Sequence, residues 1–89
     1  MTTAIRSRHL HIRVLLFASY AERLGHEVLE LQVPAGTRVS GVLERLRALP
    51  GGDQLPRHPL CALNLAHVAS EAGVAEGDEL AILPPLAGG

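Results

Sequence analysis

Residues 37–49 read TRVSGVLERLRAL and form the most strongly periodic segment of the sequence. Their apolar side chains recur at the i, i+3, i+4, i+7 and i+10 spacing of one helix face, at Val39, Val42, Leu43, Leu46 and Leu49. Thr37 is the expected N-cap, and Pro50-Gly51-Gly52 is expected to end the helix and open a polar loop that runs to about Pro59. A helix with one apolar stripe needs a second layer to pack against, so the flanking segments are candidates for a sheet.

Two strands are predicted before this helix. Residues 12–17 (IRVLLF) form a β-branched and aromatic run that is typical of a strand. Residues 27–33 alternate, with leucines and a valine on one side and Glu30 and Gln32 on the other, which predicts a half-buried strand. Between these strands, residues 18–24 predict a short helix that Gly25 closes in the C′ position.

Further strands are predicted after the helix. Residues 60–65 form a third strand candidate, with Cys61, Leu63 and Leu65 on the same side. Residues 67–74 predict a turn followed by an edge segment, and residues 76–79 a turn into a final strand at residues 80–83. Pro84-Pro85 is expected to stop the hydrogen-bonded pairing of that last strand.

This order of elements predicts an α+β fold, with a mixed four- to five-stranded sheet and one main helix packed on one of its faces. A chain of 89 residues is long enough for one small domain, which we place at residues 10–85. Residues 1–9 are predicted to be a disordered polar tail, and residues 86–89 a flexible tail ending in Gly-Gly.

The sheet face without the main helix is expected to carry an apolar patch. In residues 12–17 the alternation directs Leu15 and Phe17 away from the helix, and in residues 80–83 it directs Ala81 and Leu83 the same way. If the two strands are neighbours, these four residues form a partner surface. The alternative is that a loop covers the face.

The last stretch, Leu83-Pro84-Pro85-Leu86-Ala87-Gly88-Gly89, is the strongest functional signal. Two glycines carry a carboxylate on a backbone without side chains, which can enter a channel too narrow for a residue with a Cβ. From Leu86 to Gly89 the extended chain reaches roughly 13 Å, far enough to enter another protein's active site. A carboxylate is a poor electrophile, so carrying a group on Gly89 requires activation, for example as an acyl-adenylate. The alternative is an inert frayed end.

Several other functions find no support in the sequence. A net charge of −1 and only two aromatic residues do not match a nucleic-acid binder. No segment has the length or apolarity of a signal peptide or membrane span, and the single cysteine favours a reducing compartment, so we expect a cytoplasmic protein. We expect Cys61 to pack in the core, and no metal site, because His9 and His11 have no third ligand beside them.

The sequence resembles the small, sulfur-carrying subunits of molybdopterin synthase and related ubiquitin-like sulfur carriers. The matching segments are residues 12–18 (IRVLLFA), the helix at residues 39–49, residues 62–64 (ALN) and residues 77–89 (GDELAILPPLAGG). The Pro-Pro pair distinguishes this group from thiamine-type carriers. Two departures are Leu83, where an aromatic residue is common, and Leu65-Ala66, where a polar or glycine turn would follow Asn64.

The resemblance implies a β-grasp (ubiquitin-like) fold and two docking events. An E1-like adenylating enzyme would use ATP to activate Gly89, which would become a thiocarboxylate. The tail would then enter the large synthase subunit and donate sulfur to cyclic pyranopterin monophosphate. The chain would bind no cofactor and supply no catalytic side chain, and its partner interface would comprise Leu15, Phe17, Ala81, Leu83, Pro84, Pro85, Leu86 and Ala87.

Two other functions are compatible with this sequence. The first is a related carrier that delivers sulfur to cysteine, thiamine or another thiolated metabolite. The second is a non-covalent interaction module of ubiquitin-like fold, in which the open face binds a partner and Gly88-Gly89 is idle.

Overall fold

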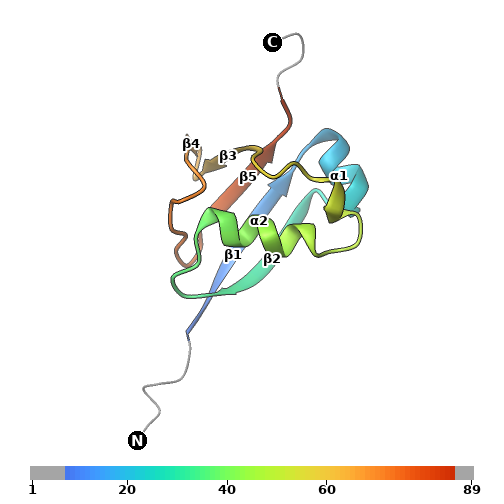
Figure 1. Ribbon diagram of the computed structural model, residues 1–89. Coiled ribbons are helices and arrows are strands. Elements are labelled where there is room, and N and C mark those ends of the chain that lie inside the picture. The colour runs from blue at the N-terminus through green and yellow to red at the C-terminus, as the bar shows by residue number, and fades with distance from the viewer. Residues whose placement is uncertain (1–7, 86–89) are drawn as a thin grey trace, which may run out of the picture.

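The computed structural model describes residues 8–85 and consists of a five-stranded sheet covered on one face by two helices (Figure 1). Its elements, in chain order, are β1 (His9–Leu16), α1 (Ala18–Leu24), β2 (Val28–Pro34), α2 (Val39–Arg47), the 3₁₀ turn η2 (Gly52–Gln54), β3 (Leu60–Leu63), β4 (Ala66–His67) and β5 (Glu79–Leu83). The strands lie in the order β2-β1-β5-β3-β4. The predicted α+β class with a mixed sheet is confirmed.

The first and last strands are neighbours at the centre of the sheet. β1 and β5 run parallel, with Leu15 opposite Ala81 and Leu16 opposite Ile82, whereas all other pairs are antiparallel. Parallel neighbours need a long crossover, and here the whole of the intervening chain, including α2, forms it.

The core lies between this sheet and α2. The stripe predicted for the helix is buried at Val39, Val42, Leu43 and Leu46, and it faces the inward residues of β1 and β5, among them Val14, Leu80 and Ile82, which are fully buried. Each such side chain contributes roughly 1.5–3 kcal/mol through burial. Packing against α2 therefore selects one face of every strand.

The main helix differs from the prediction at both ends. Arg38, not Thr37, occupies the N-cap, and the Thr37 hydroxyl donates to the Pro34 carbonyl at 2.6 Å, which closes the turn that leaves β2. At the other end the helix stops at Arg47, and Leu49 packs half-buried against the core from the turn that follows.

The short helix α1 has the predicted bounds. Gly25 ends it with φ 78°, a left-handed conformation that glycine adopts without steric cost, and its N–H donates to the Ala21 carbonyl at 2.8 Å. The loop after α2 is less polar than predicted, because it contains η2 and buries Leu55. Gly51 is required there, since a Cβ would lie 1.9 Å from the Arg23 carbonyl oxygen.

The third strand is shorter than predicted. It ends at Leu63, and Asn64 and Leu65 form a two-residue turn with φ 50° and 73°. Leu65 is 91% exposed and Cys61 is buried, so the two residues do not lie on the same side, contrary to the prediction. The turn is imposed by Asn64, whose side chain accepts from the Glu79 N–H and donates to the Asp78 carboxylate, both at 2.9 Å.

The first strand begins earlier than predicted. His9 pairs with Pro34, and the Arg8 carbonyl accepts from the Ala35 N–H, so residue 9 belongs to the sheet and not to a tail. Residues 1–7 lie outside the described residues. Within residues 8–85 neither helix has the length and apolarity needed to cross a bilayer.

Candidate functional site

The site is built where β5 ends. This strand is paired on both sides up to Ile82 and Leu83, with β1 and β3 respectively, and Pro84-Pro85 follows without any strand pairing. Proline has no N–H to donate, so the ladder stops there as predicted. The chain therefore leaves the middle of the sheet at one of its ends (Figure 1).

The open face of the sheet carries apolar side chains beside this exit, in two transverse rows that we call the apolar rows. The first row crosses four strands and consists of Val28, Leu15, Ala81 and Ala62. Each of these residues pairs with the next in the strand register. The second row contains Leu83, its partner Leu60, and Phe17, which follows β1 directly. The structure thus brings together the predicted residues Leu15, Phe17, Ala81 and Leu83, with Phe17 42% exposed.

Two exposed residues of these rows were not predicted. Val28 and Leu60 are 48% and 47% exposed and pair with Leu15 and Leu83, so they extend the apolar rows to the strands on either side. The signal for Val28 was its place on the same side of the alternation as Glu30 and Gln32, where an apolar residue has no core to fill.

Two hollows flank the Leu60–Leu83 pair. One, of about 680 Å³, is lined by the prolines and by His67 and Val68 of the chain at and after β4. The other, of about 410 Å³, includes Tyr20 and Pro56 and lies toward the helices. Pro85 lines both hollows, so the base of the C-terminal segment sits between two apolar depressions.

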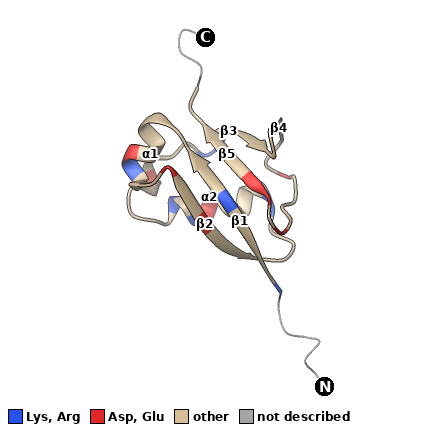
Figure 2. Ribbon diagram, turned by 180° about the vertical axis from the view of Figure 1, so that it is seen from behind, with Lys and Arg blue, Asp and Glu red and all other residues tan. Residues whose placement is uncertain are grey.

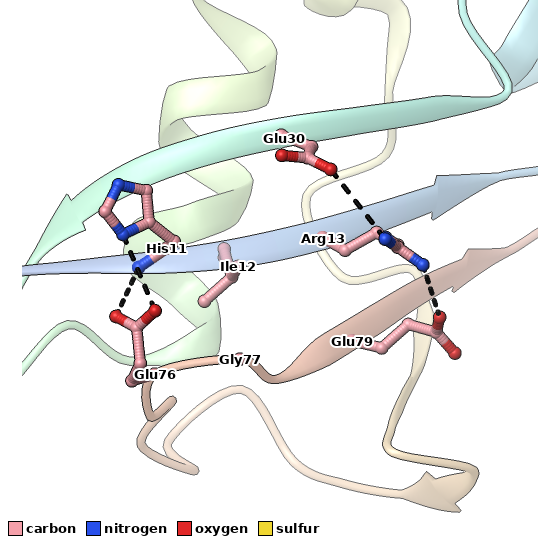
Figure 3. A pocket seen from close by; sticks show the side chains of 7 residues that line it. All are labelled: His11, Ile12, Arg13, Glu30, Glu76, Gly77 and Glu79. Atoms are coloured by element: carbon pink, nitrogen blue, oxygen red, sulfur yellow. Dashed lines mark hydrogen bonds and ion pairs between the residues drawn. The ribbon is translucent and has the colours of Figure 1, made fainter.

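The other end of the open face is charged (Figures 2 and 3). Arg13 of β1 lies between Glu30 of β2, at 3.8 Å, and Glu79 of β5, at 4.0 Å. One row further on, Glu76 accepts from the His11 backbone N–H at 2.9 Å and lies 3.5 Å from its imidazole. We call these residues, together with Gln32 beside His11, the polar rows.

Cys61 lies on the opposite, covered face of the sheet. It is 5% exposed, and its Sγ donates to the Pro59 carbonyl at 3.6 Å. Burial raises the pKa of the thiol, which keeps it protonated and unreactive near neutral pH. The predicted core role is confirmed. In residues 8–85, no three His, Cys, Asp or Glu side chains gather as a metal site would require.

Comparison with known proteins identifies the family of this chain. A family model described as the ThiS family matches residues 14–89. The chain belongs to the ThiS family. The molybdopterin synthase sulfur carrier subunit of Arabidopsis thaliana is 36% identical to it over 81 residues, 90% of this chain and 84% of that protein.

Solved structures show the same fold as this ThiS-family chain. The crystal structure of SAMP1 from Haloferax volcanii matches with a TM-score of 0.75 at 28% identity, covering 89% of this chain and 99% of that one. A chain of the complex of subunits 1 and 2 of molybdopterin-converting factor from Helicobacter pylori 26695 matches with a TM-score of 0.65 at 18% identity, covering 90% and 100%. The predicted β-grasp fold and the resemblance to sulfur carriers are confirmed.

Part of the predicted site of this ThiS-family protein falls on residues outside the described range. These are Gly88 and Gly89, predicted as the reactive end, and Leu86 and Ala87, predicted as interface residues. All four are included in the family match. Pro84 and Pro85 lie within the described range, at the exit from β5.

Proposed function

We propose that this chain is the sulfur carrier of a molybdopterin synthase and that Gly89 carries the sulfur as a terminal thiocarboxylate. The observation that carries the proposal is the position of the apolar rows at the sheet end from which β5 leads toward Gly-Gly. A partner that covers these rows receives the C-terminal segment at the edge of the contact. The similarity to the Arabidopsis thaliana sulfur carrier subunit supports the same assignment.

In this proposal Gly89 is first activated, then loaded with sulfur, and finally gives up the sulfur to the substrate. The Gly89 carboxylate attacks the α-phosphate of ATP in an E1-like enzyme, and pyrophosphate leaves. Hydrosulfide attacks the acyl-adenylate carbon, AMP leaves with the bond to the phosphate oxygen broken, and loss of the sulfur-bound proton gives the terminal thiocarboxylate. In the large subunit, the thiocarboxylate sulfur displaces an oxygen substituent from a carbon of cyclic pyranopterin monophosphate, and water then cleaves the acyl–sulfur bond, which leaves the sulfur on the pterin and restores the Gly89 carboxylate. Two such transfers would complete the dithiolene of molybdopterin.

In this proposal the chain is a carrier and not an enzyme. The catalytic side chains belong to the large subunit, ATP is used by the activating enzyme, and no cofactor or metal is held here. The described residues contribute docking and placement. The apolar rows supply the buried centre of a contact, and the Pro84-Pro85 pair limits the conformations available to the segment that follows.

Intact mass spectrometry tests this proposal. The full chain is incubated with ATP, sulfide and the activating enzyme encoded in the same genome, and we expect the replacement of one oxygen by one sulfur. A chain extended by one alanine beyond Gly89 is the matched control and should gain none. An unchanged wild-type mass, with an enzyme that forms AMP from ATP in the presence of the chain, would contradict the proposal.

A second candidate is a carrier for another sulfur pathway. The match to the ThiS family and the 28% identity to SAMP1 of Haloferax volcanii favour keeping it. Both candidates predict the same thiocarboxylate, so the mass experiment does not separate them. Incubation of the thiocarboxylated chain with the large subunit and cyclic pyranopterin monophosphate does, because only the first candidate predicts molybdopterin as the product.

A further inference from the structure

The open face is divided into two halves by the strand register. The apolar rows occupy the half where β5 ends, and the polar rows occupy the other half. The boundary between the two halves lies between Leu15 and Arg13 on β1. Leu15 pairs with apolar residues on both neighbouring strands, whereas Arg13 pairs with a glutamate on each side. Figure 2 shows the charged positions on β1 and β5 away from the end at which β5 finishes.

The polar rows carry an excess of negative charge. Glu30, Glu76 and Glu79 provide three carboxylates against the single guanidinium of Arg13, and they stay in excess even when the His11 imidazole is counted as a cation. Their side chains are 75%, 62% and 36% exposed, and a hollow of about 290 Å³ lies among them (Figure 3). Ion pairs this exposed contribute at most about 1 kcal/mol to stability, so the carboxylates are available to an incoming group.

The main helix on the covered side has the opposite bias in its last turn. Arg45 and Arg47 outnumber Glu44 in the last turn of α2, where the helix dipole favours cations, whereas Arg23 in α1 is offset by the adjacent Glu22. Arg45 also donates to the Gln32 carbonyl at the free edge of β2, at 3.3 Å. A basic partner surface is therefore attracted to the polar rows and not to the end of α2.

Apolar contact alone does not specify orientation. Burial of the apolar rows is non-directional, and a partner could rotate on them with a modest change in buried area. The C-terminal segment, however, must point into one channel for sulfur to be transferred. Charges at one end of a docking face establish the orientation and accelerate encounter, because a wrong orientation places like charges together or leaves carboxylates unpaired.

We infer that the polar rows are the second half of the docking surface, and that they meet arginine or lysine side chains on the large synthase subunit. This inference rests on the proposed function. The occupant is a protein surface with an apolar centre for the apolar rows and a basic border that faces Glu30, Glu76 and Glu79. The charged border sets the rotation of the carrier, which directs the segment after Pro85 toward the active site.

Association kinetics test the inference. The full chain is mixed with the large subunit from the same genome in a stopped-flow instrument at several salt concentrations. The variant is the triple substitution Glu30→Gln, Glu76→Gln and Glu79→Gln, in which amides keep the size of the side chains. We expect the association rate constant to fall about tenfold at low salt, and its salt dependence to flatten.

The matched control removes three carboxylates elsewhere, by Asp53→Asn, Glu44→Gln and Glu71→Gln. Asp53 and Glu44 belong to η2 and α2, and Glu71 lies between Ser70 and Ala72, whose carbonyls accept from the first N–H groups of α2. The control has the same net charge as the variant and should associate at close to the wild-type rate. Equal rates and salt slopes for the triple variant and wild type would overturn the inference, as would an equal loss in the control.

The same experiment distinguishes a wrong inference from a wrong proposed function. If the wild-type chain does not bind the large subunit at any salt concentration, the proposed partner is wrong and this inference falls with it. If wild type binds and the triple variant binds identically, only the role of the polar rows is wrong. Thermal unfolding of all three proteins checks that they are folded.

Discussion

The two faces of this sheet are made by the same strands and have opposite properties. On β5, Leu80 and Ile82 are fully buried against α2, whereas Ala81 and Leu83 belong to the open face. On the covered face every large apolar residue packs, and on the open face Val28, Leu60 and Phe17 keep over two-fifths of their surface exposed. Successive residues of one strand thus serve stability and recognition separately, because the strand period is two.

Truncation on the covered face should have the largest effect. Leu80→Ala removes a side chain with no exposed surface, and we expect the free energy of unfolding to fall by about 3 kcal/mol. Leu83→Ala, three residues along the same strand, should cost about 1 kcal/mol, because Leu83 is only partly buried. Urea unfolding measures both. Similar losses for the two variants would refute the division between the faces.

Truncation on the open face should instead act on binding. We expect Leu60→Ala to weaken binding to the large subunit about tenfold while changing the free energy of unfolding by less than about 1 kcal/mol. Leu65→Ala is the control, because it makes the same truncation beyond the other end of β3 at a residue that is 91% exposed. Isothermal titration calorimetry gives the affinities, and equal losses for the two variants would argue against a localised apolar contact.

Leu65 itself offers a smaller test, at a place where exposure and strain coincide. A leucine at φ 73° is strained, so Leu65→Gly should raise the free energy of unfolding by about 1 kcal/mol. Leu65→Ala retains the strained backbone and removes only the exposed side chain, so it should stay near wild type. If the alanine variant gained as much as the glycine variant, strain would not be the cause.

The smallest predicted effect concerns Cys61 on the covered face. Because burial raises the pKa of this thiol above its ordinary value of 9.0, folding favours the protonated form. Its contribution is therefore complete below pH 9 and is lost as pH rises through the unfolded and then the folded pKa. The urea midpoint should fall more between pH 7 and pH 10 in wild type than in Cys61→Ala, and parallel profiles would contradict this.

Local periodicity determined much of what the sequence could predict. The α2 stripe, the α1 bounds with Gly25, and the faces of β1 and β5 all depend on neighbours within a few residues along the chain. The composition of residues 83–89 supplied the functional hypothesis in the same way. These features follow from the sequence because the helical and strand periods are properties of the backbone.

Only the tertiary structure decided which segments meet. The adjacency of β1 and β5, the row that joins Val28 to Ala62, and the gathering of Glu30, Glu76 and Glu79 around one hollow depend on residues far apart in sequence. The same holds for the Asn64-Leu65 turn, which is formed by hydrogen bonds to Asp78 and Glu79. Strand pairing is set by how all the apolar faces pack together, so no local pattern specifies it.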